Sequence, residues 1–502
     1  MIPEHSSSSE PPLREAENAT SAQRESARTA GAQHVVILGA GPSGVGAAYQ
    51  LVKKGRATVT VLEQQGAVGG NAGSFELDGV YCDFGSHRLH PVVPPEIMQD
   101  LRELLGKDLL FQTRHGRIRL KGRWIHFPLK PVDLLFGLPK TFALRVLADT
   151  VRKVVPRAAS GPETFATVLE RGLGKTICRE FYFPYARKLW GVNPEELAPT
   201  TAQRRVSGSS IKKILGKVAK QIPGFKPPGA GRFYYPRRGY GQISQCLYEA
   251  ARAGGADFKF GARFTAIERD GSGVKAVRYQ LDGQEFEIPT RTVWSTIPIN
   301  LLVRGMRPEP PRDVLEAASN ISFRGMILIY LVLDQDQFST FDAYYFPEES
   351  IPISRMSEPK NFSTSSEPRG RTVLCAELPS DPECPEWKMS DDELGRRLCD
   401  WIVRAGLPAP ARVSRVVTRR LRNAYPVYRR DYEERFSTMD RWLGEIDGVL
   451  TLGRQGLFAH DNTHHTLAMA YAAVGCLSAE GKFDHERWAE HRKEFETHVV
   501  ED

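Results

Sequence analysis

The sequence lacks the features of a membrane-spanning or disulfide-stapled protein. Its 502 residues contain no apolar run near the 18 residues of a spanning helix, and the N-terminus has no apolar signal-peptide core. The seven cysteines lie far apart, and none forms a CxxC pair. This spacing argues against a zinc ribbon or a disulfide framework and favours a reducing compartment. We therefore expect a cytoplasmic protein without a metal site.

The chain is too long for a single hydrophobic core, so we expect two or three domains. A hydrophobic content of 41% and a charged content of 25% are ordinary for a globular protein. Residues 1–30 contain almost no large apolar side chains and are rich in Ser, Glu, Ala and Pro. This composition predicts a disordered leader outside the fold.

Acidic residues are absent between Leu197 and Tyr248. One interpretation is a solvated basic face. Another is attraction to an anion, either a phosphorylated substrate or an acidic membrane surface, which would place the protein at the inner face of a membrane. No recognition motif or aromatic stacking pattern indicates nucleic acid. The basic residues of this stretch are Arg204, Arg205, Lys212, Lys213, Lys217, Lys220, Lys226, Arg232, Arg237 and Arg238.

A dinucleotide-binding pattern begins at residue 34. A β-branched run over 34–38 predicts a buried parallel strand, and an apolar helix pattern follows the turn Gly39-Ala-Gly41-Pro42-Ser43-Gly44. In such a turn the first glycine permits the bend, the second lets the backbone approach a pyrophosphate, and the third allows close packing of helix and strand. The helix N-terminus supplies N–H donors. A second strand ends on Glu63, which is placed to accept hydrogen bonds from ribose hydroxyls.

A second glycine pair follows the ribose acid, in Gly69-Gly70-Asn71-Ala72. This arrangement is typical of flavoproteins, because it lets backbone amides approach the second phosphate and the ribityl chain. The segment resembles the flavin-binding region of the amine oxidase, protoporphyrinogen oxidase and phytoene desaturase superfamily. Its form is most similar to that of UDP-galactopyranose mutases. The resemblance covers residues 33–480 and implies FAD as the cofactor.

The resemblance also implies substrate-side residues. His87 lies in a Gly-x-His segment that in these flavoproteins borders the isoalloxazine, which makes it the candidate catalytic residue. A Tyr-x-x-Lys-x-Trp-Gly pattern precedes the pair Arg204-Arg205, of which one would face a substrate diphosphate. Arg355 and Tyr425 match mutase positions that contact phosphate. On composition alone, Arg355 would be a surface cation and Tyr425 an aromatic packed under a turn.

Further cofactor contacts are implied by later segments. In the superfamily the stretch around Phe264 clamps the adenine through its main chain. Gly453 and Arg454 follow a strand in a glycine-containing turn. Thr463 opens a helix of small residues, whose N-terminus would point at the flavin pyrimidine and stabilise negative charge there.

These segments predict an α/β chain in which a Rossmann-like FAD-binding domain accompanies a discontinuous second domain of mixed sheet and helices. The predicted FAD-binding domain comprises residues 31–95, 230–300 and 445–490. The predicted substrate or cap domain comprises residues 96–229 and 301–444.

Three functions fit this sequence. The first is an FAD-dependent oxidoreductase that acts on a small, phosphorylated or sugar-linked molecule and passes electrons to a second acceptor. The second is a redox-neutral isomerase of the mutase kind. The loop at 458–465 opposes it, because mutases have tyrosine and aspartate where this chain has Phe-Ala-His-Asp-Asn-Thr-His-His. The third is a non-catalytic flavoprotein that docks through the basic stretch. Oligomeric state does not follow from the sequence.

Overall fold

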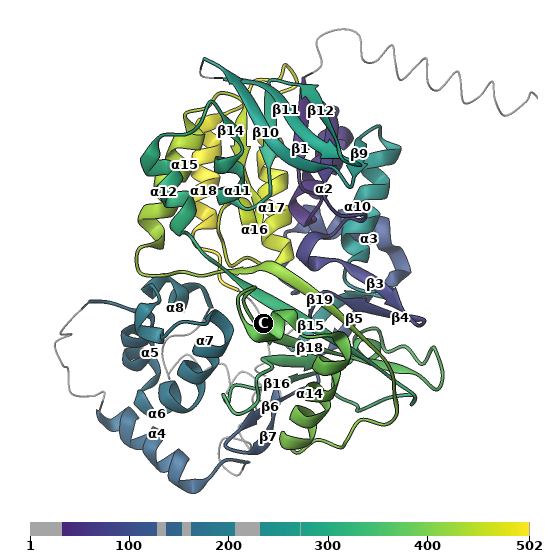
Figure 1. The fold of residues 1–502 in the computed structure, drawn as a ribbon, viewed down its shortest axis with the longest axis vertical. Coiled ribbons are helices and arrows are strands. Elements are labelled where there is room, and N and C mark those ends of the chain that lie inside the picture. Colours follow the sequence, from purple (N-terminus) through teal and green to yellow (C-terminus); the bar gives the residue numbers. More distant parts are fainter. Residues whose placement is uncertain (1–32, 128–136, 153–161, 206–230, 272, 501–502) are drawn as a thin grey trace, which may run out of the picture.

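A computed structural model describes residues 33–127, 137–152, 162–205, 231–271 and 273–500 (Figure 1). The predicted leader lies outside these residues. So do residues 206–230, which hold five of the ten basic residues between Leu197 and Tyr248, and the side chain of Arg205.

A parallel sheet organises the upper half of the molecule in Figure 1. Its strands come from distant parts of the chain, and all neighbouring strands run parallel. Their carboxyl ends therefore meet at one edge, where ligands of such sheets bind. In spatial order the strands are β20 (Val449–Thr451), β13 (Thr292–Ser295), β1 (His34–Leu38), β2 (Thr58–Glu63) and β9 (Asp257–Phe260).

Both faces of this sheet are covered, which explains the uninterrupted apolar run in β1. Val35 and Ile37 belong to a core shared with helices on one face, while Val36 and Leu38 belong to a second core. The first core contains residues of α2 (Pro42–Lys53), α3 (Pro95–Leu105), α10 (Gln242–Ala253), α17 (Thr463–Gly475) and α18 (His485–Phe495). The second contains residues of β10 (Arg263–Asp270), β11 (Gly273–Leu281), α11 (Ile299–Arg304), α12 (Arg312–Asn320) and α15 (Tyr432–Gly444).

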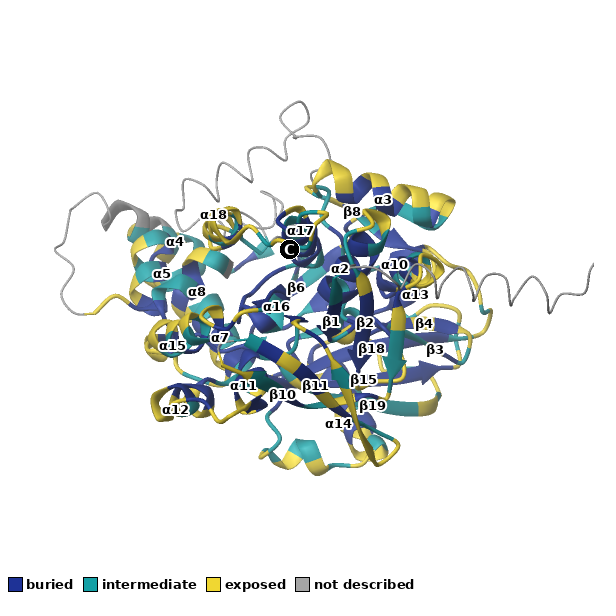
Figure 2. Ribbon diagram, turned by 90° about the horizontal axis from the view of Figure 1, so that it is seen from above, coloured by how far each residue is buried: buried dark blue, intermediate teal, exposed yellow. Residues whose placement is uncertain are grey.

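Strands β10 and β11 belong to a smaller sheet over the second face. Its spatial order is β12 (Gln284–Pro289), β11, β10 and β14 (Met306–Arg307). Figure 2 shows the resulting layers from above, with buried strands inside and exposed helix faces outside.

A larger mixed sheet fills the lower half of Figure 1. All its strand pairs are antiparallel except β16 with β6. Its strands, in spatial order, are β19 (Val413–Pro426), β15 (Phe323–Leu333), β18 (Thr372–Pro379), β17 (Arg355–Ser357), β16 (Ala343–Tyr345), β6 (Gly116–Leu120) and β7 (Arg123–Phe127).

Strand β15 shows why this sheet is buried on both faces. Met326, Leu328 and Tyr330 alternate with Ile327 and Ile329, and the two sets enter different cores, as the period of two in a strand requires. One core includes α14 (Asp391–Arg404). The other includes α5 (Phe165–Leu173), α7 (Phe183–Trp190) and α8 (Pro199–Arg205).

Two short ribbons connect the halves. Strand β3 (Ser74–Leu77) pairs with β4 (Val80–Asp83), and β5 (Leu109–Thr113) pairs with β8 (Arg232–Pro236). The hydroxyl of Tyr330, in the lower sheet, donates to the Asp83 carbonyl oxygen at 2.7 Å. The predicted fold class is therefore confirmed. The domain boundaries stay a prediction.

Candidate functional site

The predicted nucleotide turn lies at the carboxyl end of β1. Gly39 has φ of +95°, and its N–H donates to the Leu62 carbonyl at 2.8 Å. A Cβ on Gly44 would lie 1.9 Å from the Gly39 carbonyl oxygen, so only glycine permits this helix start. A Cβ on Gly41 would meet nothing within 4 Å. Helix α2 begins at Pro42 without a side-chain cap, which leaves N–H groups of its first turn for a phosphate.

The second glycine pair packs directly against this turn. Gly69 and Gly70 have φ of +110° and +51°, and the Gly69 N–H donates to the Ala40 carbonyl at 2.8 Å. A Cβ on Gly70 would lie 3.3 Å from the Gly41 Cα. Two glycine segments without side chains therefore pack against each other, which lets a dinucleotide approach their backbone closely.

Glu63 lies beneath both glycine segments. Its side chain is buried, its Oε2 accepts from the Ala40 N–H at 2.7 Å, and its Oε1 accepts from the Gln65 N–H at 2.8 Å. Burial raises the pKa of the Glu63 carboxyl above its usual value, although these backbone hydrogen bonds oppose the shift. Its predicted contact with ribose hydroxyls stays a prediction.

The start of α17 meets the start of α2. A Cβ on Gly453, where φ is +79°, would lie 2.8 Å from the Ser43 Oγ. The Ser43 hydroxyl donates to the Thr466 carbonyl at 2.6 Å. Thr463 is the first residue of α17, and Asn462 caps it in a capping box with His465. Two helix N-termini therefore lie at one edge of the parallel sheet.

Asn71 and Arg454 connect this edge to the larger sheet. Asn71 Nδ2 donates to the Asn423 carbonyl at 2.9 Å. Arg454 Nη2 donates to the Ala424 carbonyl at 3.1 Å, and its guanidinium lies 5.0 Å from the centre of the Tyr425 ring. Three predicted site residues, Asn71, Arg454 and Tyr425, are therefore brought together at the end of β19.

His87 lies next to this junction and stacks on Tyr240, with ring centres 5.2 Å apart. A side-chain hydrogen bond connects Tyr240 with Thr463 of α17. Burial, together with the positive charges of Arg355 and Arg454, lowers the pKa of His87 to about 4. The ring is therefore neutral near pH 7, and its Nδ1 makes no hydrogen bond within the described residues.

Arg355 does not point at open solvent, because Glu377 holds it. Its Nε donates to Glu377 Oε1 at 2.9 Å and its Nη2 to Glu377 Oε2 at 3.0 Å. Glu377 Oε1 also accepts from the Ser86 N–H at 2.7 Å. Burial opposes the charge of Arg355, but the Glu377 carboxylate together with Tyr345 and Tyr425 raises the pKa of Arg355 well above its usual value.

Arg204 contacts a group of buried aromatic rings. Its Nη1 donates to the Tyr428 hydroxyl at 3.3 Å, and Tyr428 stacks on Tyr432 at 4.1 Å between ring centres. Lys188 is the lysine of the Tyr-x-x-Lys-x-Trp-Gly pattern. It donates to the carbonyls of Phe346, Glu348 and Ile353 and so supports the loop before β17.

Phe264 lies in β10, opposite Tyr279 of β11. The pairing with β11 is irregular between Phe264 and Ala266, and a Cβ on Gly305 would lie 2.5 Å from the Phe264 ring. Its side chain therefore packs within the smaller sheet and its surroundings, and the contact of its main chain with adenine stays a prediction.

Two buried acids near His87 were missed by the sequence analysis. One is Glu377. The other is Asp83, which accepts from the Ser74 hydroxyl at 2.6 Å, the Tyr235 hydroxyl at 2.8 Å and the Tyr240 N–H at 2.8 Å. Burial raises the pKa of Asp83 to about 6 despite these donors. The sequence contains the Asp-x-Gly-x-His spacing at 83–87, but it does not reveal the hydrogen-bond partners of Asp83.

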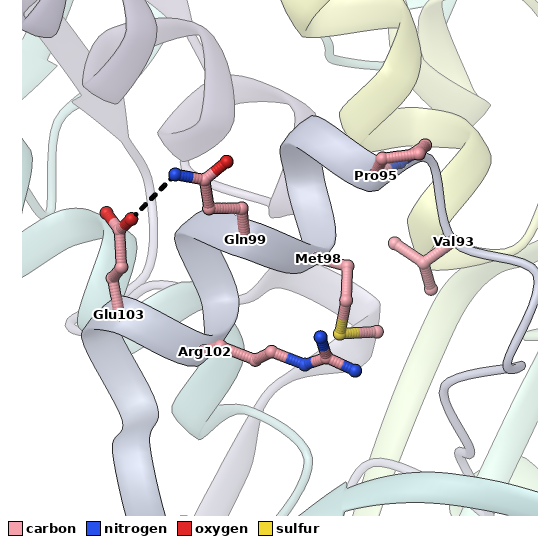
Figure 3. A pocket seen from close by; sticks show the side chains of 6 residues that line it. All are labelled: Val93, Pro95, Met98, Gln99, Arg102 and Glu103. Atoms are coloured by element: carbon pink, nitrogen blue, oxygen red, sulfur yellow. Dashed lines mark hydrogen bonds between the residues drawn. The ribbon is translucent and has the colours of Figure 1, made fainter.

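Two hollows on the surface lie away from these residues. One, of about 500 Å³, lies along α3 and is lined by Val93, Pro95, Met98, Gln99, Arg102 and Glu103 (Figure 3). The other, of about 600 Å³, is lined by residues between Asp336 and Arg369. Neither includes a predicted site residue.

Comparison with known proteins decides the family. The model of flavin-containing amine oxidoreductases matches residues 42–468. The chain belongs to this family. The predicted superfamily is therefore confirmed, and the match covers every predicted site residue except Gly39 and Gly41, which lie just before it.

Individual relatives are distant. The chain is 25% identical to phytoene dehydrogenase of Streptomyces griseus over 318 residues, which are 57% of this chain and 59% of that protein. It is 26% identical to mitochondrial protoporphyrinogen oxidase of Nicotiana tabacum over 174 residues, 33% of this chain and 34% of that protein. The matches thus span less than two thirds of either relative. Reduced UDP-galactopyranose mutase has the same fold, with a TM-score of 0.75, 21% identity and coverage of 88% of this chain and 93% of that one.

No helix in the described part of the chain is long and apolar enough to cross a membrane. Half of the basic residues that motivated an anionic partner fall within residues 206–230, outside the described residues.

Proposed function

We propose that this protein binds FAD at the carboxyl edge of the parallel sheet and is an oxidoreductase that acts on a small molecule. The observation that best supports the proposal is the close packing of Gly70 against Gly41, next to the buried carboxylate of Glu63. A dinucleotide needs backbone N–H donors and an absence of side chains, and both occur here.

The residues at this edge fit the cofactor that the family implies. Gly41, Gly69 and Gly70 would receive the pyrophosphate, and Glu63 would receive the ribose. Gly453, the first residue of the short helix α16 (Gly453–Gly456), packs closely on the start of α2, because a Cβ there would lie 2.8 Å from the Ser43 Oγ. The start of α17, at Thr463, would place a partial positive charge near the pyrimidine end of the flavin.

The flavin supplies the redox chemistry when bound, and the protein positions the reactants. Neutral His87 can accept or donate one hydrogen bond at its Nδ1, and burial keeps it uncharged. Arg454 and Tyr425 border the same region. We assign His87 to contact with substrate or flavin, and Arg454 and Tyr425 to the substrate side.

The ion pair of Arg355 with Glu377 favours an oxidoreductase over a mutase. Arginine binds a diphosphate best through two parallel N–H donors of its guanidinium. Here two donors of Arg355 already bind a carboxylate. The net charge of the pair is near zero, so it attracts an anion weakly.

A redox-neutral isomerase is the second candidate, and the proximity of Arg355 and Arg454 to His87 favours it. Both cations could serve a diphosphate if Glu377 were displaced. In that case Arg355→Ala would weaken the binding of UDP without changing FAD content.

An anaerobic test distinguishes the oxidoreductase from the isomerase. The oxidised holoprotein is mixed without oxygen with a panel of amines, porphyrinogens, polyenes and nucleotide sugars. An oxidoreductase bleaches the flavin absorbance with its substrate, and a second acceptor restores it. An isomerase converts a nucleotide sugar only after the flavin has been reduced, and consumes no further reductant. Conversion of that second kind, with no bleaching by any compound, would reject the oxidoreductase.

A further inference from the structure

The loop before α17 and the chain after α18 bring three ligand-type side chains together. Asp461, His465 and His498 each offer an oxygen or nitrogen atom, and these atoms lie within 4.8 Å of one another. Their side chains are 1%, 13% and 15% exposed. No step assigned above uses them.

We propose that this group binds a nitrogen-preferring divalent transition metal such as Zn²⁺, and that the ion fixes the segment around His498 to the first turn of α17. This departs from the expectation drawn from the cysteine pattern, because two imidazoles and one carboxylate need no cysteine.

The spacing fits an ion better than hydrogen bonds. Asp461 Oδ1 lies 3.6 Å from His465 Nδ1, and Asp461 Oδ2 lies 3.4 Å from His498 Nδ1. The first distance is too long for a hydrogen bond, and the second is at the long end of the range. Ligand atoms on a tetrahedral ion with bonds of about 2.0–2.1 Å lie roughly 3.3–3.4 Å apart. Two of the three separations are therefore already close to those around a metal ion, and all three ligand atoms lie within 4.8 Å of one another.

The buried oxygen of Asp461 supplies independent support. Asp461 Oδ1 is inaccessible to solvent and makes no hydrogen bond within the described residues. A buried carboxylate oxygen without a partner carries a large desolvation cost. A metal ion between the carboxylate and the two rings would satisfy it.

The two imidazoles are placed to act together. His465 Nδ1 accepts the long capping hydrogen bond from the Asn462 N–H at 3.3 Å, so a bound ion would take this lone pair in place of that hydrogen bond. The rings of His465 and His498 stack with centres 4.1 Å apart, so little movement brings both toward one ion.

The surrounding charges select the kind of metal. Arg204 lies within electrostatic reach of Asp461, and Arg454 donates to the Asp461 carbonyl at 3.3 Å. These cations disfavour Mg²⁺ or Ca²⁺, which rely on several anionic oxygen ligands. Bonds to imidazole nitrogen depend less on net charge and suit Zn²⁺, Co²⁺ or Ni²⁺.

Titration of the full-length holoprotein with ZnCl₂ and CoCl₂ tests the proposal. We expect one high-affinity equivalent by calorimetry, and visible absorption bands from bound Co²⁺. His498→Ala and His465→Gln should each weaken binding by more than the roughly tenfold to hundredfold that loss of an outer partner causes. The control is His491→Ala, a histidine on neighbouring α18 that pairs with Glu494 instead. It should bind as the wild type does.

Zn²⁺ should also raise the Tm of the wild type and of His491→Ala, but not of the other two variants. If His498→Ala does not fold, His498→Asn replaces it in the same comparison. The proposal is overturned if the wild type binds neither metal at one equivalent. Unchanged affinity in the variants at 465 and 498 would place the metal elsewhere and overturn it equally.

Discussion

The guanidinium of Arg355 and the carboxylate of Glu377 form a bidentate ion pair, with donor–acceptor distances of 2.9 and 3.0 Å. The pair also fixes the loop before His87, because Glu377 Oε1 accepts from the Ser86 N–H. An arginine that resembles a phosphate ligand in sequence is thus committed to a partner inside its own chain. That relationship changes what the site is expected to bind.

Breaking this pair should destabilise the protein. The side chains are 15% and 4% exposed, so Arg355→Ala leaves Glu377 nearly buried without a counter-charge, at a cost of about 3 kcal/mol. The double variant Arg355→Met with Glu377→Gln should recover part of that loss, because neither charge remains. Urea unfolding of both variants measures the difference.

The exposed pair of Arg291 with Asp270 provides the control, and its removal should cost at most about 1 kcal/mol. If the double variant is no more stable than Arg355→Ala, the buried charge is not the cause of the loss.

Side chains added to the glycine loop should weaken FAD binding. In Gly70→Ala the new Cβ would lie 3.3 Å from the Gly41 Cα, at a φ of +51° that L residues disfavour. We expect FAD affinity to fall by about tenfold or more, equivalent to roughly 1.4 kcal/mol. Fluorescence titration of the apoprotein measures it.

Gly66→Ala is the matched control in the same loop. A Cβ there meets nothing within 4 Å, and Gly66 has no positive φ. Equal loss of affinity in both variants would show that the loop responds to any added side chain, and not to contact with the Gly41 turn.

His87 should give stability a defined pH dependence. Its pKa is about 4 in the folded protein against 6.5 in the unfolded chain. Between these values the unfolded state binds more protons, so this contribution to stability rises with pH and is lost as the pH falls from 6.5 to 4. His87→Gln should remove it.

The measurement is the difference in unfolding free energy between wild type and His87→Gln at several pH values. A difference is needed because Asp83 acts in the opposite direction: its raised pKa, about 6, makes stability fall as the pH rises from about 4 to 6. A difference that stays constant from pH 4 to 6.5 would contradict a neutral, buried His87.

The sequence predicted the nucleotide turn well because its parts are contiguous. Gly39, Gly41 and Gly44 bend one turn, and Glu63 ends the next strand, so local spacing fixes their geometry. The same holds for α17, whose cap and small residues are consecutive.

The substrate side was harder to predict, because its partners come from distant segments. Glu377 is a single acid in an otherwise mostly apolar strand, β18, and pairs with Arg355 and with Ser86, which is 291 residues away. His498 approaches Asp461 only because α18 packs beside α17. Such contacts depend on the order of strands and helices in space, which no local pattern encodes.

The visible absorbance spectrum of the purified protein tests the central claim most directly. We predict the two absorption bands of an oxidised flavin, with about one FAD released per chain on denaturation, or full uptake of added FAD by the apoprotein. A protein with no flavin absorbance that also binds no added FAD would contradict the account.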